Sequence, residues 1–337
     1  MCQALNDIFC YDSHMKVLVT GGAGYIGSIT VKELQNKGHE VVVYDNLAYG
    51  HKEAVNCPLI VGDLLDQEFL INNVTGSFDA VVHFAAYALA GESMKDPYKY
   101  FKSNLQGGLN LLEFMRKRKI KNIIFSSTCA IYGYPSKLPV AENEPKKPES
   151  VYGESKLMFE KILDWYEKVY DIKHINLRYF NAAGATLDGE LGEEHDPETH
   201  IIPIAIKTAL GKYSSFKLFG TDYKTPDGTC IRDYIHVLDL ASAHIQALDK
   251  IQQTKKGDYF NLGTGKGYSN REVLDMVKKV SGVDFKIEEV ERRTGDPDAI
   301  YADNTKAVKE LGFSSKYSDL ETIVKTAWAW HSKKNNQ

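Results

Sequence analysis

A glycine-rich turn between an apolar run and a helical pattern constrains the fold of this chain more than any other feature. The apolar run covers residues 16–20 and the helical pattern residues 25–37. Gly21, Gly24 and Gly27 fall at their junction, in the spacing G-x-x-G-x-x-G. Glycine permits a positive φ and a close approach of the backbone, and a helix start offers unpaired N–H groups to an anion. The pattern predicts a strand–turn–helix unit that holds a diphosphate group.

Beyond this unit, short apolar runs alternate with helical patterns. The expected buried strands cover residues 16–20, 41–44, 59–61, 80–84, 122–126 and 174–178, and the expected helices residues 25–37, 66–73, 97–118 and 152–170. Such alternation favours right-handed crossovers and a parallel sheet covered by helices on both faces. The predicted fold class is therefore α/β, with a doubly wound parallel sheet of the Rossmann type.

An acidic residue at the end of the second expected strand indicates which dinucleotide is bound. Asp45 lies 18 residues beyond Gly27, close to the ~20 that separate the glycines from the ribose carboxylate in dinucleotide-binding units. A carboxylate at this place accepts a hydrogen bond from a 2′-hydroxyl and repels a 2′-phosphate. No arginine follows in residues 46–50. The expected cofactor is NAD rather than NADP.

The pattern becomes less regular after about residue 180, and 337 residues correspond to about two domains. Residues 184–198 and 220–228 are expected to be long loops, whereas helical patterns return at 237–250, 270–280 and 320–333, with a strand-like run at 259–262. We expect an NAD-binding domain over residues 15–181, to which residues 237–262 return. A smaller C-terminal α/β substrate domain is expected mainly over residues 182–337. Residues 1–14 are treated as an extension, since they lack the features of a secretory signal.

Charge and cysteine content exclude several classes of partner. The chain carries 41 Lys and Arg against 45 Asp and Glu, whereas nucleic-acid and anionic membrane surfaces need an excess of cations. It also lacks a run of ~18 apolar residues that would span a membrane. The five cysteines form no C-x-x-C pair, which argues against a disulfide framework or a zinc site. We expect a cytoplasmic enzyme with reduced thiols and a small-molecule substrate.

A tyrosine and a lysine four residues apart supply a candidate base. Tyr152 and Lys156 share one face of an expected helix. A neighbouring ammonium and an oxidised nicotinamide both favour the phenolate, which would bring the pKa of Tyr152 down from its usual value near 10. Thr128 follows an expected strand at its carboxyl end, where doubly wound sheets bind ligands, and its hydroxyl could share the substrate's proton.

Two histidines lie near acidic residues in the first expected loop. His195 and His200 accompany Glu193, Glu194 and Asp196, a composition that could suggest a metal site. Their i, i+5 spacing in a Pro-containing loop matches no usual ligand pattern, so polarity of the loop is the favoured interpretation and no metal is expected.

These motifs resemble the extended short-chain dehydrogenase/reductases, and among them the UDP-glucose (UDP-galactose) 4-epimerases. The resemblance extends from Met15 almost to the C-terminus. It is carried by Val19–Gly27, Asp45–Leu47, Gly62-Asp63, His83–Ala86, Phe125–Gly133, Tyr152–Lys156, Leu177–Asn181, Leu218–Tyr223, Asp227–Val237 and Arg293–Asp296. The stretches in the second half are more specific than those in the first, which many sugar-nucleotide enzymes share.

The resemblance implies two sets of site residues beside the catalytic Tyr152, Lys156 and Thr128. The cofactor set is Gly21, Gly24, Tyr25, Ile26, Gly27, Asp45, Asn46, Asp63, Leu64, Phe84, Ala85, Ala86, Ala88, Asn104, Ser126, Tyr152, Lys156 and Tyr179. The substrate set is Thr128, Tyr152, Asn181, His200, Ile201, Lys217, Leu218, Phe219, Arg232, Arg293, Asp296 and Ile300. Within it, Arg232 and Arg293 match diphosphate contacts, and residues 217–219 match a strand beside the uracil.

Three positions depart from the family's pattern. Ala88 stands where well-known members carry a lysine, and His200 where some carry an asparagine. Ile300 stands where strict members carry a tyrosine and permissive ones a small residue, at the border of the space for a 2-acetamido group. The resemblance therefore implies a sugar pocket of intermediate selectivity.

The implied function is reversible C4 epimerisation of a UDP-hexose through transient oxidation by tightly bound NAD. Related activities remain as alternatives: a nucleotide-sugar dehydratase, or a 4-epimerase of UDP-N-acetylhexosamines or UDP-pentoses. Dehydratases and decarboxylases need an acidic residue after the threonine, where residues 129–132 carry none. A non-catalytic NAD sensor is disfavoured because Tyr152 and Lys156 are both present. Members of the family usually pair as homodimers through two long helices, here residues 97–118 and 152–170.

Overall fold

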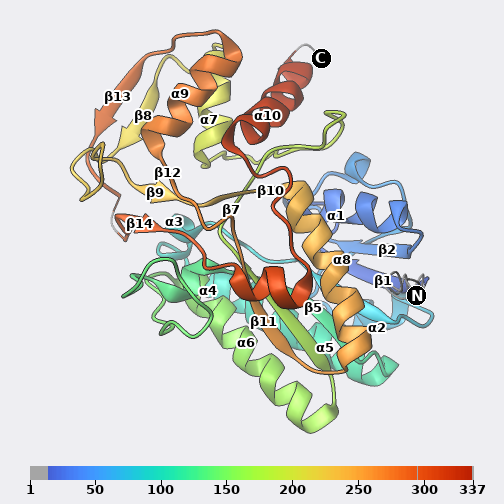
Figure 1. Ribbon diagram of the computed structural model, residues 1–337. Coiled ribbons are helices and arrows are strands. Elements are labelled where there is room, and N and C mark those ends of the chain that lie inside the picture. Colours follow the sequence, from blue (N-terminus) through green and yellow to red (C-terminus); the bar gives the residue numbers. More distant parts are fainter. Residues whose placement is uncertain (1–13, 294, 336–337) are drawn as a thin grey trace, which may run out of the picture.

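A seven-stranded parallel sheet forms the centre of the computed structural model, which describes residues 14–293 and 295–335. The strand order is β11-β6-β5-β4-β1-β2-β3. The strands are β1 (Lys16–Thr20), β2 (Glu40–Asp45), β3 (Leu59–Val61), β4 (Ala80–His83), β5 (Asn122–Thr128), β6 (Lys173–Tyr179) and β11 (Asp258–Leu262). Helices cover both faces (Figure 1), which confirms the predicted doubly wound α/β fold.

Each face of the sheet has its own apolar core. Buried valines of β1 and β2 pack against α1 (Tyr25–Asn36) and α8 (Val237–Thr254) on one face. On the other face, residues such as Leu18 and Val81 pack against α2 (Gln67–Asn73), α5 (Gly107–Arg118) and α6 (Val151–Tyr170). Because both faces are covered, the central strands are continuous apolar runs, which is why the sequence indicated them clearly.

The helix expected over residues 97–118 is divided into three parts. It begins as α4 (Pro97–Tyr100), continues as a π-helical turn, η2 (Phe101–Gln106), and ends as α5. The wide turn contains Asn104, whose side chain is buried against Ser155 of α6. A Cβ on Gly108 would lie 2.3 Å from the Phe159 ring, so glycine allows α5 and α6 to pack closely.

A smaller lobe lies above the sheet in Figure 1 and consists mainly of α7, α9, α10 and short strands. Its elements are α7 (Ile201–Ala209), α9 (Asn270–Ser281), α10 (Leu320–Asn335), β8 (Phe216–Phe219), β9 (Ile231–Arg232), β12 (Tyr268–Ser269), β13 (Ile287–Val290) and β14 (Ala299–Ile300). The pair β7 (Asn181–Ala183) and β10 (Tyr234–His236) joins this lobe to the sheet. Periodicity did not predict α7, which is rich in β-branched residues and contains Pro203 in its first turn, where proline is tolerated.

The remaining elements are short. They are α3 (Ala90–Ser93), η1 (Lys52–Ala54), η3 (Cys129–Tyr132) and η4 (Ala307–Leu311). Residues 237–262, expected to return to the first domain, contain α8 and β11, and β11 pairs with β6 at the edge of the sheet. Within the described ranges, no helix is both long and apolar enough to cross a membrane. Residues 1–13 of the expected extension lie outside the described residues.

Candidate active site

The carboxyl ends of the parallel strands bring the predicted cofactor residues to one edge of the sheet. The strand order reverses at β1, which has β4 on one side and β2 on the other. Gly21 follows β1, Asp45 ends β2, Phe84 follows β4 and Thr128 ends β5. Doubly wound sheets bind their ligands at such a switch point, outside the carboxyl ends of the strands.

The glycine turn packs closely against neighbouring backbone at Gly21 and Gly27, but it has free space at Gly24, just before α1. Gly21 has a φ of +73°, and a Cβ there would lie 2.4 Å from the backbone nitrogen of Ala85. A Cβ on Gly27 would lie 2.2 Å from the Gly21 carbonyl oxygen. A Cβ on Gly24 would meet only that oxygen, at 3.5 Å, among the described atoms, and no described side chain caps α1. The donor set and the space therefore suit a diphosphate at the helix N-terminus.

The carboxylate of Asp45 connects the glycine turn to the segment after β2. Its two oxygens accept hydrogen bonds from the backbone nitrogens of Ala23, at 2.9 Å, and Leu47, at 2.8 Å. A carboxylate has about four acceptor positions, so capacity remains for the hydroxyls of a ribose. The arrangement fits the predicted recognition of NAD.

Hydrogen bonds also fix the loops that carry other residues of the cofactor set. Asp63 accepts from the Asn46 amide at 3.0 Å and from the Leu65 nitrogen at 2.8 Å. The Asn104 side chain accepts a hydrogen bond from the Tyr87 nitrogen and donates to the Tyr87 carbonyl oxygen and the Ser155 hydroxyl. Asn104 thereby positions the loop after β4. The rest of the set lies around the same strand ends: Leu64 is buried, Tyr25, Ile26, Phe84, Ala85 and Ala86 are half-buried, and Ala88 is exposed.

Lys156 is buried on α6, four residues after Tyr152. It is 3% exposed, and its Nζ donates a hydrogen bond of 2.7 Å to the carbonyl oxygen of Ser126. Burial lowers the pKa of Lys156 to about 7. Burial also raises the pKa of Tyr152 to about 12, although a hydrogen bond with Thr128 acts in the opposite direction. In the protein alone, loss of hydration therefore outweighs the other influences on the phenol. The joint lowering of its pKa by the ammonium and the nicotinamide concerns the complete site and stays a prediction.

The hydroxyl groups of the candidate site line the end of β5. Thr128 is buried, caps η3 and accepts a hydrogen bond of 3.1 Å from the Ala130 nitrogen. Ser126 hydrogen-bonds to the Tyr179 hydroxyl on the neighbouring strand β6. Burial raises the pKa of Tyr179, so this phenol remains a neutral hydrogen-bonding group. The pair lies at the carboxyl ends of β5 and β6, where Thr128 is the register partner of Tyr179.

A cavity of about 790 Å³ brings together most of the predicted substrate set. Nine of the twelve residues line it: Asn181, His200, Ile201, Lys217, Leu218, Phe219, Arg232, Arg293 and Asp296. The Arg293 guanidinium lies 4.1 Å from the centre of the Phe219 ring, and Arg232 donates to the Ile231 and Pro297 carbonyl oxygens at 2.9 Å. Two fixed guanidinium groups in one cavity suit a diphosphate.

The other three predicted substrate residues do not line this cavity. Thr128 and Tyr152 belong to the strand-end site described above. Ile300 is 5% exposed and packs in an apolar cluster with Tyr132, Leu157 and Phe180. It can therefore influence a sugar through the packing of its neighbours.

Asp233 is a residue that the sequence reasoning did not assign. It is fully buried, and its carboxylate accepts from the backbone nitrogens of Thr264, at 2.9 Å, and Ala302, at 3.1 Å. Its carbonyl oxygen accepts from the Asn181 amide at 3.1 Å. It thereby holds three segments around the cavity. Its place beside Arg232 in the matched stretch was the only signal in the sequence.

The loop before α7 folds the two histidines and two glutamates into one cluster. The ligand-type atoms of Glu193, His195, Glu198 and His200 all lie within 4.8 Å of one another. Sequence spacing did not indicate this, because a bend at Asp196-Pro197 turns the chain back on itself. Electrostatic attraction and hydrogen bonding by Glu193 raise the pKa of His200 to about 10, despite an opposing effect of burial.

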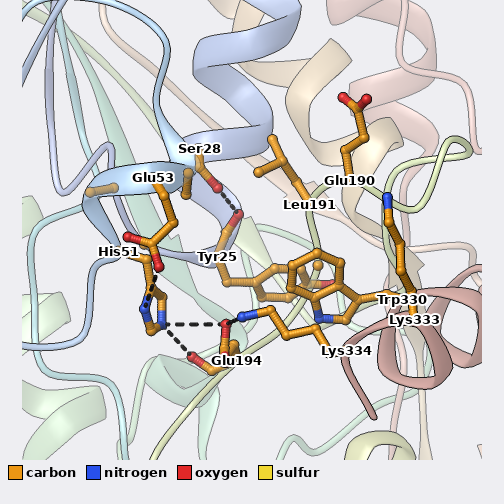
Figure 2. Close-up of a pocket in the computed structure, with 14 residues that line it drawn as sticks. Tyr25, Ser28, His51, Glu53, Glu190, Leu191, Glu194, Trp330, Lys333 and Lys334 are labelled. Atoms are coloured by element: carbon orange, nitrogen blue, oxygen red, sulfur yellow. Dashed lines mark hydrogen bonds and ion pairs between the residues drawn. The ribbon is translucent and has the colours of Figure 1, made fainter. Parts of the chain in front are cut away.

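A second cavity, of about 350 Å³, lies on the outer side of the glycine turn. Figure 2 shows Tyr25 of α1 beside Trp330 of α10 and Ser28 directed at the Tyr25 carbonyl oxygen, with His51 and Lys334 both directed at Glu194. The 184–198 loop therefore lies between the two cavities, with Glu194 lining the smaller and Glu193 the larger.

A model of the NAD dependent epimerase/dehydratase family matches residues 17–263. The chain belongs to this family. It is 48% identical to the UDP-glucose 4-epimerase of Streptococcus mutans, with 94% of this chain and 97% of that protein covered. Among solved structures, the UDP-glucose 4-epimerase of Brucella ovis in complex with NAD is 47% identical, with a TM-score of 0.91 over 94% of this chain and 98% of that one.

A third relative broadens the range of sugars within the epimerase/dehydratase family. The UDP-Glc/GlcNAc 4-epimerase of Campylobacter jejuni is 42% identical, with a TM-score of 0.82 over 94% of this chain and 99% of that one. The comparisons confirm the resemblance on which the site residues were chosen. In the present chain, η3 directly follows Thr128. It consists of Cys129, Ala130, Ile131 and Tyr132 and contains no carboxylate.

Proposed function

We propose that this protein catalyses the reversible inversion of C4 in a UDP-hexose, with UDP-glucose and UDP-galactose as its substrate pair. The observation that carries the proposal is the meeting of two parts. A tyrosine, a lysine and a threonine lie at the carboxyl end of β5, and a cavity with two arginines lies in the adjoining lobe. The first part supplies acid–base groups, and the second suits a nucleoside diphosphate.

In this proposal, different cavity residues contact different parts of the nucleotide. Arg232 and Arg293 hold the diphosphate, and β8, with Lys217 and Phe219, lies along the uracil. Asp296, 3.4 Å from Arg232, is available to the ribose hydroxyls. Asn181 and His200 face the sugar and the diphosphate. We propose that this lobe binds the substrate and that the sheet domain binds the cofactor.

The sheet domain holds NAD through the glycine turn, Asp45 and the loops after β3 and β4. When bound, NAD supplies the oxidising equivalent that removes and returns the hydride of C4. Tyr152, directly or through Thr128, accepts and returns the proton of the 4-hydroxyl group. Burial opposes the phenolate, so the positive charge of Lys156 and of the nicotinamide must offset that cost in the complete site. Contacts with the UDP group keep the oxidised sugar bound until the hydride returns.

We also propose that the protein is a homodimer in the cytoplasm. The large apolar side chains of α6 that are exposed in the single chain include Met158, Trp165 and Val169. Their spacing places them along one side of the helix, which suits burial against a second copy. The described cysteines, Cys57, Cys129 and Cys230, are all free, as a reducing compartment favours.

Product analysis by NMR tests the proposed reaction. The purified protein is incubated separately with UDP-glucose, UDP-galactose, UDP-N-acetylglucosamine and a UDP-pentose. We expect the first two to converge on the same equilibrium mixture without added NAD. A dehydrated or decarboxylated product, or no conversion of either hexose, would contradict the proposal. Conversion of only the acetamido or pentose sugars would reassign the substrate.

A further inference from the structure

The cluster formed by Glu193, His195, Glu198 and His200 has the dimensions of a metal site. The His200 Nδ1 lies 2.7 Å from the Glu193 carboxylate and 3.2 Å from that of Glu198. The His195 Nδ1 lies 3.2 Å from Glu193 and 4.0 Å from Glu198. Four ligands at the usual ~2.0–2.1 Å around a tetrahedral Zn²⁺ would be roughly 3.3 Å apart. The four nitrogen–oxygen separations, from 2.7 to 4.0 Å, scatter around that value, and all ligand-type atoms lie within 4.8 Å of one another.

Two of the candidate ligand atoms have no hydrogen-bond partner among the described residues. They are the buried Nδ1 of His195 and Oε2 of Glu198. The Glu198 side chain is only 1% exposed, and the nearest cation to its Oε2 is the Lys207 Nζ at 3.8 Å. A buried polar atom without a partner costs roughly 1–3 kcal/mol, and more when the group is charged. The Oε1 of Glu198 is the oxygen near the two histidines, whereas its Oε2 lies on the side of Lys207.

An imidazolium–carboxylate network explains only part of this arrangement. A protonated His200 pairs well with Glu193, but such a pair leaves the His195 Nδ1 with a 3.2 Å contact to the same Glu193 oxygen and the Glu198 Oε2 with only the 3.8 Å contact to Lys207. One divalent cation would occupy all four groups and balance the charge of two buried carboxylates. Imidazole nitrogens favour zinc-type ions over Mg²⁺ and Ca²⁺, which prefer oxygen ligands.

We propose that Glu193, His195, Glu198 and His200 form a closed structural site for a divalent zinc-type ion. Four protein ligands leave no open position, so the ion's role is to fix the loop rather than to react. The loop is tied to three elements. The Trp330 indole of α10 donates to the Glu193 carbonyl oxygen at 3.2 Å, the Tyr25 ring of α1 meets the His195 ring edge-on, and His200 caps α7.

The site would also position a residue of the substrate cavity. Glu193, Glu198 and His200 line that cavity. Binding through Nδ1 fixes the tautomer of His200 and leaves Nε2–H as a hydrogen-bond donor. Loss of the ion is therefore expected to loosen the wall of the cavity nearest the glycine turn.

Zinc binding by the tag-free full-length protein tests the proposal independently of the proposed reaction. The protein is stripped with a chelator, titrated with Zn²⁺ against a chromophoric competitor, and analysed for metal by mass spectrometry after gel filtration. We expect about one Zn²⁺ per chain and a higher melting temperature with the ion than without it. With Co²⁺ as the probe, we expect the visible bands of a tetrahedral nitrogen–oxygen site. A sulfur-to-cobalt band would place the ion at a cysteine and contradict the proposal.

Two variants and a matched control locate the ion. Glu198→Gln and His195→Gln each remove a ligand, and we expect them to weaken Zn²⁺ binding by at least ~100-fold. Glu194→Gln removes a neighbouring carboxylate that pairs with Lys334 outside the cluster, and it should bind as the wild type does. Melting temperatures measured in the presence of chelator show whether each variant is folded. If Glu198→Gln does not fold, the Zn²⁺ affinity of His195→Gln decides the test. A wild type without stoichiometric zinc, or folded ligand variants that bind like the control, would overturn the site.

Discussion

The Nζ of Lys156 lies 2.7 Å from the carbonyl oxygen of Ser126 and donates a hydrogen bond to it. This contact joins the first turns of α6 to the end of β5, so the base and the strand-end hydroxyls keep a fixed relation. Ser126 in turn hydrogen-bonds through its hydroxyl to Tyr179. A buried cation satisfied by a neutral carbonyl stays costly, which is why burial lowers the pKa of Lys156 to about 7.

Replacing Tyr152 by phenylalanine should lower kcat by roughly 10²–10⁴-fold, the usual contribution of a general base. KM for the UDP-sugar should change little, because the phenol oxygen acts mainly in the transition state. Steady-state kinetics with UDP-galactose measure both constants. Tyr166→Phe is the matched control, since its hydroxyl lies on the same helix but donates to Glu113 of α5. Turnover of Tyr152→Phe near the wild-type value would remove Tyr152 from the role of base.

Lys156→Met should move the rising limb of the kcat–pH profile to higher pH. Burial alone lowers the pKa of Lys156 to about 7, but a phenolate on Tyr152 favours the ammonium and the ammonium favours the phenolate. Removal of the amine takes away this mutual stabilisation, which raises the pKa of the base, so a smaller fraction of Tyr152 is ionised at any given pH. The profile is measured between pH 6 and 10 with NAD content checked in each sample. An unchanged limb with a lower plateau would mean that Lys156 only positions neighbouring groups.

The unfolding free energy should fall in acid because of His83. This side chain is buried and bonded to the Thr20 hydroxyl at 2.7 Å, and burial lowers the pKa of His83 to about 3. Between pH 6.5 and 3 the unfolded chain binds the proton and the folded chain does not, so up to roughly 4 kcal/mol of stability is lost as the pH falls. Urea unfolding of wild type and His83→Gln measures this. His83→Gln should lose less unfolding free energy in acid than the wild type does. The control variant His51→Gln should lose as much as the wild type. Equal losses in all three would exclude His83 as the cause.

Ile300 should set the tolerance for a 2-acetamido group. We expect good activity with UDP-glucose and UDP-galactose and weak activity with UDP-N-acetylglucosamine, because modest steric contacts discriminate by only about 1–3 kcal/mol. Ile300→Tyr should abolish the acetamido activity selectively, and Ile300→Ser should raise it. Ile300 packs against Phe180 and Leu157, so melting temperatures accompany the kcat/KM ratios. A ratio that neither substitution changes would show that Ile300 does not control selectivity.

Much of the central sheet was predictable because strands such as β1 and β2 are apolar runs followed by a chemical signal, although β6 and β11 mix apolar with polar residues. Gly21 and Asp45 could be placed at strand ends from spacing alone. The substrate lobe was not predictable in this way. Its strands are two to four residues long, and its cavity depends on contacts between distant segments, such as Arg293 over Phe219 and Asp233 bonded to Thr264 and Ala302. Only the resemblance to known enzymes located Arg232 and Arg293.

Two features of the site could be predicted neither from the residue pattern nor from the resemblance to known enzymes. The direction in which the pKa of Tyr152 shifts depends on how deeply α6 packs against β5. The spacing of residues in the sequence does not reveal this depth. The convergence of His195 and His200 depends on a bend within the loop rather than on helical or strand periodicity. In both cases tertiary packing, rather than the local pattern, decides the chemistry.

The fate of the hydrogen on C4 tests the central claim most directly. UDP-galactose is converted in D₂O, without added NAD, and the product is examined by proton NMR and mass spectrometry. Transient oxidation carries this hydrogen as a hydride that never meets the solvent, so UDP-glucose should form with protium at C4 and no deuterium on any sugar carbon. UDP-galactose deuterated at C4 should likewise yield UDP-glucose that keeps its deuterium. Exchange of C4 with solvent, or conversion that consumes added NAD in stoichiometric amounts, would contradict this mechanism.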